Sequence, residues 1–129
     1  MENKRVILDS NIFIAFYYKD DSSHQEAVFL MEQLVGSHII VPYCVIQEVA
    51  TVLAYKCGKK KSDAFLSDLK KSDDLILVDD NTEVEIDFYL KFSQKLSFTD
   101  IALIHLAERY DAILFTFDRQ LLNLFKKFS

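Results

Sequence analysis

The sequence predicts an α/β protein, a three-layer α/β/α sandwich built around a mainly parallel central sheet. Three observations predict this fold: four short apolar runs without alternation, helix-like segments between them, and a total of only two Gly and one Pro. Apolar runs of this kind are typical of strands covered on both faces, and strands that alternate with helices form parallel sheets. With a length of 129 residues, we expect residues 1–129 to form one domain.

The predicted strands come first, because they fix where a site can lie. They are the four apolar runs Val6–Leu8, His38–Val41, Leu75–Val78 and Ala112–Phe117. The carboxyl ends of parallel strands meet at one edge of a sheet, and α/β proteins carry their working sites at this edge. Residues that directly follow these runs are therefore the first candidates for function.

The helices occupy the segments between the strands. Ser23 and Glu26 form a capping-box pattern that begins a helix running to about Val35, with Gly36 as its stop. The other helical segments are Val45–Leu53 (ending near Gly58), Ser62–Lys71, a segment capped by Thr82 and Glu85, and Leu96–Ala107. The tail after residue 118, RQLLNLFKKFS, is compatible with either a helix or a strand.

Composition excludes several classes of protein. Half of the residues are hydrophobic, with eleven Phe and six Tyr, so the chain is not intrinsically disordered. We find no apolar run long enough to span a membrane and no secretory signal, so we expect a cytoplasmic protein without membrane contact. Cys44 and Cys57 lack the spacing of a metal site and are expected to be reduced thiols.

The charge of the chain is acidic and unevenly distributed. The net charge of −5 argues against a broadly basic surface that binds nucleic acid. The segment Asp73–Asp87 contains seven acids and no base, whereas lysines cluster at Lys56 and Lys59–Lys61 and again at Lys126 and Lys127. Solvated faces are a sufficient explanation for such blocks. The acidic segment would be a poor surface for a nucleic acid, and we expect it to face away from one.

Four acids lie near the carboxyl ends of the predicted strands. Asp9 and Asp118 directly follow strands, Glu48 lies in the first turns of a helix after a strand, and Asp100 begins the helix that leads to the last strand. Each has a simpler explanation. Asp9 and Asp118 are suitable N-caps, and Glu48 can be a solvated flank of its helix. Asp100 is stabilised by the helix dipole and resembles a capping-box partner of Ser97.

Together, the four acids favour a different interpretation. Carboxylates that converge on one edge repel each other, by about 1 kcal/mol per pair at 4 Å even in water, and capping needs no such convergence. A hard divalent cation such as Mg²⁺ does prefer oxygen ligands of this kind. The three histidines are scattered, and His105 is expected to be a satisfied core residue. The chain also lacks a phosphate-binding loop, a dinucleotide fingerprint and a nucleophile elbow.

The motifs around these acids resemble those of the PIN domain family, and especially its VapC-type toxins. VILDSNIFI matches a first strand followed by an acid and small polar residues, and VIQEVATVL matches the second acidic motif. LSFTDIALIHLA matches the third, and LFTFD matches the last, with a Thr two residues before the acid. The four motifs occur in order over nearly the whole chain.

The resemblance implies a metal-dependent endoribonuclease that hydrolyses RNA phosphodiester bonds. It implies that Asp9, Glu48, Asp100 and Asp118 form an acidic catalytic quartet that binds one or two Mg²⁺ or Mn²⁺ ions. Asp9 and Asp100 are implied as direct ligands, Asp118 as a direct, water-mediated or second-metal ligand, and Glu48 as a ligand or as the group that orients the attacking water. Residues implied to steer the carboxylates or to contact the substrate are Ser10, Asn11, Thr116 and Arg119.

The resemblance also implies partners: an RNA substrate, a cognate antitoxin protein and a second copy of the chain in a homodimer. Two alternatives stay open, an RNA-processing PIN nuclease outside a toxin–antitoxin pair and a non-catalytic PIN-like binding module. A phosphotransfer receiver domain is disfavoured because it requires paired acids after the first strand, where this chain has Asp9 followed by Ser10 and Asn11.

Overall fold

The centre of the molecule is a parallel β-sheet, as the sequence predicts. The computed structural model describes residues 4–128. Its strands are β1 (Arg5–Leu8), β2 (His38–Pro42), β3 (Leu75–Val78) and β4 (Ile113–Phe115). All neighbouring strands pair in parallel, in the order β3-β2-β1-β4. The first and last segments of the chain that form strands, β1 and β4, are therefore direct neighbours.

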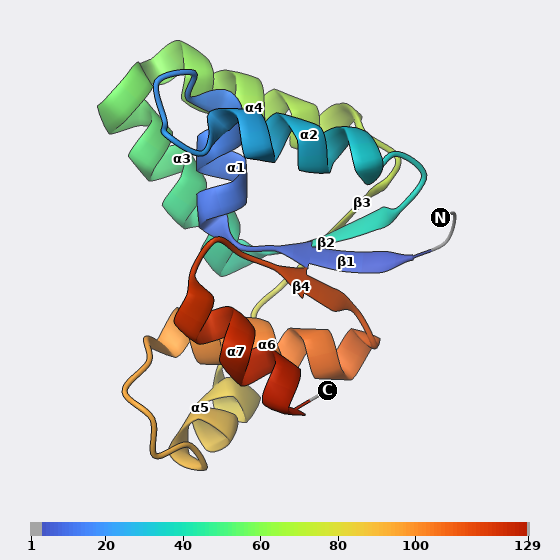
Figure 1. Cartoon of the computed structure of the whole chain (residues 1–129), viewed down its shortest axis with the longest axis vertical. Helices are drawn as coiled ribbons and strands as arrows, with labels where there is room; N and C mark the ends of the chain where they lie inside the picture. Colours follow the sequence, from blue (N-terminus) through green and yellow to red (C-terminus); the bar gives the residue numbers. More distant parts are fainter. Residues whose placement is uncertain (1–3, 129) are drawn as a thin grey trace.

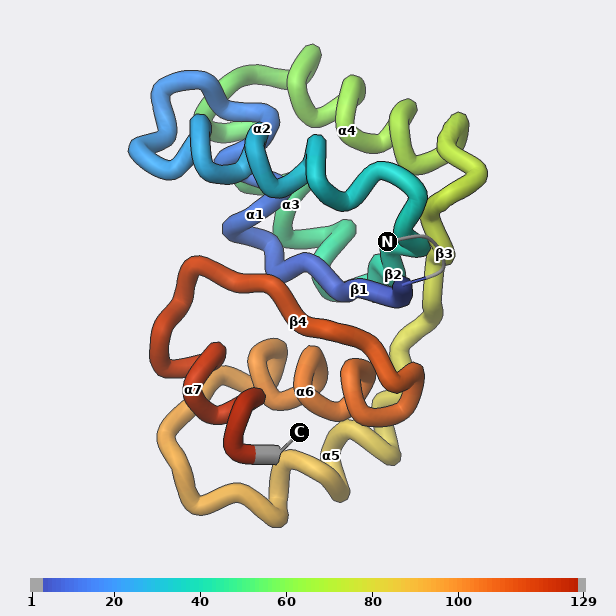
Figure 2. Tube along the Cα trace, turned by 45° about the vertical axis from the view of Figure 1, so that its right-hand side comes forward, coloured from blue at the N-terminus to red at the C-terminus, as the bar shows by residue number. Residues whose placement is uncertain are grey.

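Helices cover both faces of the sheet and complete the three layers (Figure 1). One layer contains α1 (Ser10–Tyr17), α2 (His24–Gln33), α3 (Tyr43–Cys57) and α4 (Lys59–Lys71). The other contains α5 (Thr82–Leu90), α6 (Phe98–Tyr110) and α7 (Arg119–Phe128). The tail after residue 118 thus forms a helix up to residue 128, and Ser129 lies outside the described residues. Figure 2 shows α6 lying directly beneath β4, with α5 on its outer side.

The core lies where the sequence is most continuously apolar. Val6, Ile7 and Leu8 of β1 are fully buried, because this strand has neighbours on both sides and helices on both faces. On one face the core continues into α3 through Val45, and on the other into α6. The central strand β1 and the buried helix α6 thus form a rigid support for whatever residues follow them.

Three local predictions need correction. Ser23 does precede α2, but its side chain makes no capping hydrogen bond; instead, the carboxylate of Asp21 accepts the Ser23 backbone N–H at 2.8 Å. The N-cap of α5 is Asn81 rather than Thr82, and the Glu85 carboxylate accepts the Asn81 N–H at 2.8 Å. The last strand is shorter than predicted, because the chain leaves the sheet after Phe115.

A glycine separates the long helices α3 and α4. Gly58 is the C-cap of α3 and has a φ of +92°, in the region that residues with a side chain rarely adopt. The turn lets α4 fold back along α3, which is visible as the helical hairpin at the top of Figure 1. Lys59–Lys61, at the start of α4, consequently lie at the tip of this hairpin.

Both cysteines are free thiols, as the sequence predicts, and both are half-buried. Burial raises the pKa of Cys44 to about 12, with further contributions from the negative charges of Asp80 and Glu85. None of the helices within residues 4–128 has the length and apolar character needed to cross a lipid bilayer.

Candidate active site

Asp9 is the buried member of the predicted site. It directly follows β1 and caps α1, where its Oδ1 accepts the Ser10 backbone N–H at 2.7 Å. Its own N–H donates to the carbonyl of Phe115 at 3.0 Å, which ties the end of β1 to the end of β4. Only 7% of the residue is exposed. The carboxylate is therefore fixed by its strand, by its helix and by the neighbouring strand.

Thr116 and Asn11 hold the second oxygen of Asp9. The Thr116 hydroxyl donates to Asp9 Oδ2 at 2.7 Å, and the Asn11 amide donates to Thr116 Oγ1 at 3.2 Å and more weakly to Asp9 Oδ2 at 3.4 Å. The Asn11 carbonyl oxygen accepts the Phe117 N–H at 3.3 Å. Two of the polar residues predicted to steer the carboxylates thus form one hydrogen-bonded group with Asp9, across the joint between β1 and β4.

Asp118 lies at the end of the same hydrogen-bonded group. Its N–H donates to Thr116 Oγ1 at 3.0 Å, and its Oδ1 accepts the N–H groups of Gln120 and Leu121 at 2.9 and 3.2 Å. Asp118 therefore caps α7, as the simpler interpretation of this residue predicts. The residue is exposed, so its other oxygen is accessible to solvent or a ligand.

Asp100 lies in the first turn of α6. The helix begins after Ser97, whose hydroxyl accepts the Asp100 N–H at 3.0 Å. Burial raises the pKa of the Asp100 carboxyl, and hydrogen bonding to Ser97 opposes this increase, as in the reciprocal arrangement of a capping box. Behind Asp100, most of the stretch from Ile101 to Ala107 is buried, so the carboxylate projects from a well-packed part of the helix.

Glu48 is an exposed member of the predicted quartet. It lies on α3, one residue before the fully buried Val49, so it stands at the border of the apolar face. Its negative charge raises the pKa of both Asp9 and Asp100. Glu48 therefore faces the other acids despite the long distance between them in sequence.

Electrostatic coupling links all four acids. Burial raises the pKa of Asp9, and the negative charges of Asp100 and Glu48 raise it further, against the hydrogen bonds from Thr116 and Ser10. Burial also raises the pKa of Asp100, and the charges of Asp118 and Glu48 add to this effect. Each acid thus interacts electrostatically with at least one other acid of the group.

The remaining predicted residues differ in position. Ser10 is buried, and its hydroxyl has no hydrogen-bond partner among the described residues, so only its backbone contacts Asp9. Arg119 is exposed at the start of α7.

Within residues 4–128, no three acidic, histidine or cysteine side chains are close enough to form a preformed metal cage. Mg²⁺ commonly keeps several waters and uses only one or two carboxylates, so it does not require such a cage.

Two expectations about other residues are wrong in part. His105 packs against Phe88 with ring centroids 4.9 Å apart, but its Nε2 is buried without a partner among the described residues, so it is not a satisfied core residue. The acidic segment does not face away as a unit. Strand β3 runs parallel to β1, so its carboxyl end lies at the same edge of the sheet as Asp9. Asp79 and Asp80 follow β3 and lie at this edge, whereas Asp73 precedes β3 and lies at the opposite edge.

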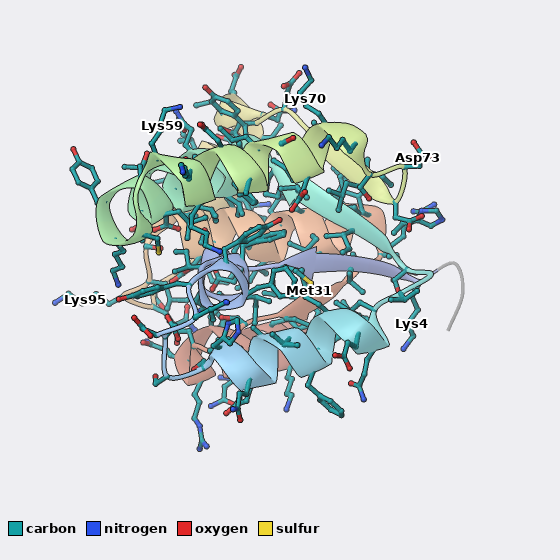
Figure 3. The ribbon with its side chains drawn as sticks, turned by 90° about the horizontal axis from the view of Figure 1, so that it is seen from above. Lys4, Met31, Lys59, Lys70, Asp73 and Lys95 are labelled. Carbon is teal, nitrogen blue, oxygen red and sulfur yellow. The ribbon has the colours of Figure 1, made fainter. Side chains whose placement is uncertain are left out.

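The distribution of lysines is clearer from above the sheet. In Figure 3, Lys59 and Lys95 lie toward the side to which β1 points, whereas Lys4 and Asp73 lie toward the opposite side. Lysines from both helical layers therefore lie on the side of the carboxyl edge: Lys59 of the α3–α4 hairpin, which pairs with Asp63, and Lys95 of the segment before α6.

The sequence identified the acids of this site but not all of their supports. The carbonyl of Phe115 and the N–H of Phe117 both bond to site residues, and backbone groups of this kind leave no signal in residue types. The Ser97–Asp100 spacing and the Thr two residues before Asp118 were the signals that did point to supporting side chains.

Comparison with known proteins agrees with the fold of this chain. The sequence matches the PIN domain family over residues 6–127. A comparison with curated protein sequences gives no significant match. Among solved structures, the fold is similar to the crystal structure of VapC20 from Mycobacterium tuberculosis, a toxin that cleaves the sarcin–ricin loop. The TM-score is 0.81 at 15% sequence identity, over 92% of this chain and 94% of that chain. The chain belongs to the PIN domain family.

Proposed function

We propose that this protein is a metal-dependent endoribonuclease whose active site is the group Asp9, Glu48, Asp100 and Asp118. The family to which the chain belongs is one of nucleases. The observation that carries the proposal is the buried Asp9 carboxylate, whose pKa is raised by burial and by two further acids from distant elements. A fold gains no stability from carboxylates placed so that they repel, so their convergence supports a catalytic purpose.

The donor set fits Mg²⁺ or Mn²⁺. All four groups are carboxylates, which hard divalent cations prefer, and the family is one that generally uses such ions. Asp9 and Asp100 are the residues that would hold a first ion, and Asp118 would ligate directly, through water, or as part of a second site. The ion would supply activation of water and stabilisation of the negative charge on the phosphate.

The protein's own groups would perform the remaining tasks. Thr116 and Asn11 would keep the Asp9 carboxylate in one orientation, because they already bond to it and to each other. Glu48, which is exposed, would orient the attacking water through its carboxylate or add a ligand. Arg119, which is exposed, would contact the RNA phosphate, where a positive group is favourable, and the backbone N–H of Ser10 would keep its hydrogen bond to Asp9.

The physiological role that we favour is that of a toxin whose RNA cleavage is restrained by a cognate antitoxin. The fold that the chain shares with VapC20 supports this role. We further propose that the chain forms a homodimer. An RNA-processing nuclease outside a toxin–antitoxin pair would use the same residues and the same chemistry, and a short neighbouring reading frame for a DNA-binding protein would favour the toxin.

Cleavage of RNA by the purified protein tests the enzymatic proposal. We expect cleavage that requires Mg²⁺ or Mn²⁺, stops with a chelator, and falls by about 100-fold or more in Asp100→Asn, because loss of a ligand removes several kcal/mol of transition-state stabilisation. Asn preserves helix N-termini as well as Asp does, so folding should be retained. The matched control is Asp111→Asn at the other end of α6, where Asp111 has a φ of 51° that Asn tolerates well.

Ligand-induced stabilisation tests metal binding separately from activity. An ion that binds only the folded state at a concentration of 100 Kd stabilises it by about 2.7 kcal/mol. We therefore expect Mn²⁺ to raise the Tm of the wild-type protein and of Asp111→Asn but not of Asp100→Asn. A wild-type protein that binds no divalent ion and cuts no RNA across a broad panel would instead be a non-catalytic binding module.

A further inference from the structure

The edge strand β3 is a prominent feature of the fold that the proposed nuclease does not use. It has β2 on one side and no strand among residues 4–128 on the other. An edge strand presents a row of unpaired backbone N–H and C=O groups to solvent. Ile76 and Leu77 are 40% and 53% exposed, and they point to opposite faces of the sheet because side chains alternate along a strand. Both faces of the edge are thus apolar and open.

Further exposed apolar residues lie on α5, which follows β3 after the exposed residues Asp79 and Asp80. Figure 2 shows the chain passing from the end of β3 into this helix. Ile86 and Leu90 are 44% and 74% exposed and lie one helical turn apart, on the side of α5 that also carries Glu83 and Asp87. Several of the exposed large hydrophobic residues of the protein are therefore found in one segment of the chain, between residues 75 and 90.

Acidic residues surround this apolar surface. Two aspartates precede β3 and two follow it, in the stretch Asp73-Asp-Leu-Ile-Leu-Val-Asp-Asp80, and all four are exposed. Charged residues at an edge strand normally prevent it from pairing with another copy of itself. Here, both parallel and antiparallel pairing of two β3 strands would place aspartates opposite aspartates, which is destabilising. The charge pattern therefore disfavours a second copy as the occupant.

A partner of the opposite charge meets no such penalty. We propose that β3 binds an extended polypeptide segment that has alternating apolar residues in its centre and Lys or Arg at both ends. The segment adds a fifth strand to the sheet: its backbone pairs with the free edge of β3, and its apolar side chains cover Ile76 and Leu77. Its basic ends lie against the two pairs of aspartates, which sets register and orientation. Ile76 and Leu77, which the segment covers, are not residues of the proposed nuclease site.

A designed peptide tests the proposal directly. The probe is a fluorescent peptide with a Val-Thr-Val-Thr-Val centre and two lysines at each end, and its counterpart carries two glutamates at each end. We expect the basic peptide to bind at least tenfold more tightly and to weaken as salt is raised. The double variant Asp79→Asn/Asp80→Asn should lose about half of the salt dependence, whereas Glu26→Gln/Glu32→Gln on α2, with the same change in net charge, should bind as the wild type does.

N-methylation distinguishes strand pairing from simple charge attraction. Alternate backbone N–H groups of an added strand point toward β3, so methylating one alternate set of amides should abolish binding, and methylating the other set should not. Equal binding of the two methylated peptides would overturn the proposal. So would an unchanged affinity in Ile76→Thr/Leu77→Thr, a variant whose new side chains remain suited to a strand and whose folding is checked by its Tm.

Two further measurements separate binding at β3 from the nuclease site and from dimerisation. Asp100→Asn should bind the basic peptide as well as the wild type does, so a failure of the nuclease proposal leaves this one intact. Sedimentation of the wild-type protein tests the alternative occupant. A dimer that dissociates in Leu77→Lys would mean that a second copy covers β3, and the proposal would be wrong.

Discussion

Three acids of the candidate site serve two purposes at once. Asp9 caps α1 and Asp118 caps α7, while Asp100 lies in the first turn of α6. The N-terminus of a helix carries a partial positive charge that stabilises a carboxylate by about 0.3–1 kcal/mol. Three such helix ends therefore meet at the edge of the sheet and offset part of the repulsion among the acids. Capping and catalysis are compatible roles for the same residues.

At the scale of a single residue, Thr116 is the group on which the orientation of Asp9 depends. Its hydroxyl donates to Asp9 and accepts from Asn11 and from the Asp118 N–H. Thr116→Val keeps the shape but leaves Asp9 Oδ2 without its shortest hydrogen bond. We expect a loss of about 1–2 kcal/mol in the free energy of unfolding and of about 10–100-fold in kcat, the usual effect of removing a group that orients a ligand.

The conservative variant separates positioning from stability. Thr116→Ser restores the hydroxyl and should recover kcat to within about threefold of the wild type, because the hydrogen bonds rather than the methyl group hold the carboxylate. Denaturant unfolding and steady-state cleavage of an oligoribonucleotide provide the two measurements. Equal kcat values for Thr116→Val and the wild type would mean that Asp9 is held well enough by its backbone, Ser10 and Asn11.

At the scale of elements, the sequence predicts strands and helices best where one physical effect, such as burial on both faces, determines the structure. The strands followed from uninterrupted apolar runs, since a strand buried on both faces has no polar alternative. Helix α1 was not among the predicted helices, because it starts directly after Asp9 and its apolar residues merge with those of β1. At Ser23 and Thr82 the capping pattern was present, but Asp21 and Asn81 compete for the same role, and only the folded chain decides between them.

The same reasoning explains how much of the site could be predicted. The rule that parallel strands end at one edge allows Asp9, Glu48, Asp100 and Asp118 to be predicted as a candidate group. The raised pKa of Asp9 could not be predicted, because it depends on burial and on the mutual approach of side chains from different layers. Contacts between helices are equally hidden: Tyr17 on α1 donates to Asp68 on α4 at 2.5 Å, and no motif predicts this pair.

The contact between Tyr17 and Asp68 yields a prediction about pH. Burial raises the pKa of Tyr17 above its ordinary value of 10.0, and its bond to the Asp68 carboxylate raises it further. The protonated phenol therefore stabilises the folded state below pH 10, and this contribution is lost as the pH rises from about 10 through the higher pKa of the folded state. We expect Tyr17→Phe to lower the free energy of unfolding by about 1 kcal/mol at pH 7.

The difference between Tyr17→Phe and the wild type should shrink steadily above pH 10, because the unfolded wild-type chain gains stability by ionising. Tyr18→Phe is the matched control, since Tyr18 is the neighbouring half-buried tyrosine at the end of α1. Denaturant titrations between pH 7 and pH 11 measure both differences. A Tyr17→Phe effect that stays constant across this range would show that packing, and not the hydrogen bond, accounts for it.

At the scale of the whole molecule, an acidic protein must still attract a polyanion. The net charge of −5 repels RNA at long range, and the acids of the site do so at short range until a cation binds. The lysines that flank the carboxyl edge are therefore the groups that can lead an RNA strand to the site. Lys59 and Lys95 lie on the side of the carboxyl edge, and Lys4 and Asp73 lie on the opposite side (Figure 3). We expect RNA to approach from the side of the α3–α4 hairpin tip.

The helix α4 carries lysines at both ends, so a lysine variant at one end can be compared with a matched variant at the other end. Lys60 and Lys61 lie at the hairpin tip, beside Lys59, which already pairs with Asp63, whereas Lys70 and Lys71 lie at the far end of the helix. In the inactive Asp100→Asn background, we expect Lys60→Gln/Lys61→Gln to lower the salt dependence of RNA binding by about 0.7 per lost phosphate contact. Lys70→Gln/Lys71→Gln changes the net charge equally and should leave the slope unchanged. Equal losses in both variants would mean that RNA responds only to the total charge, and the approach from the hairpin tip would be wrong.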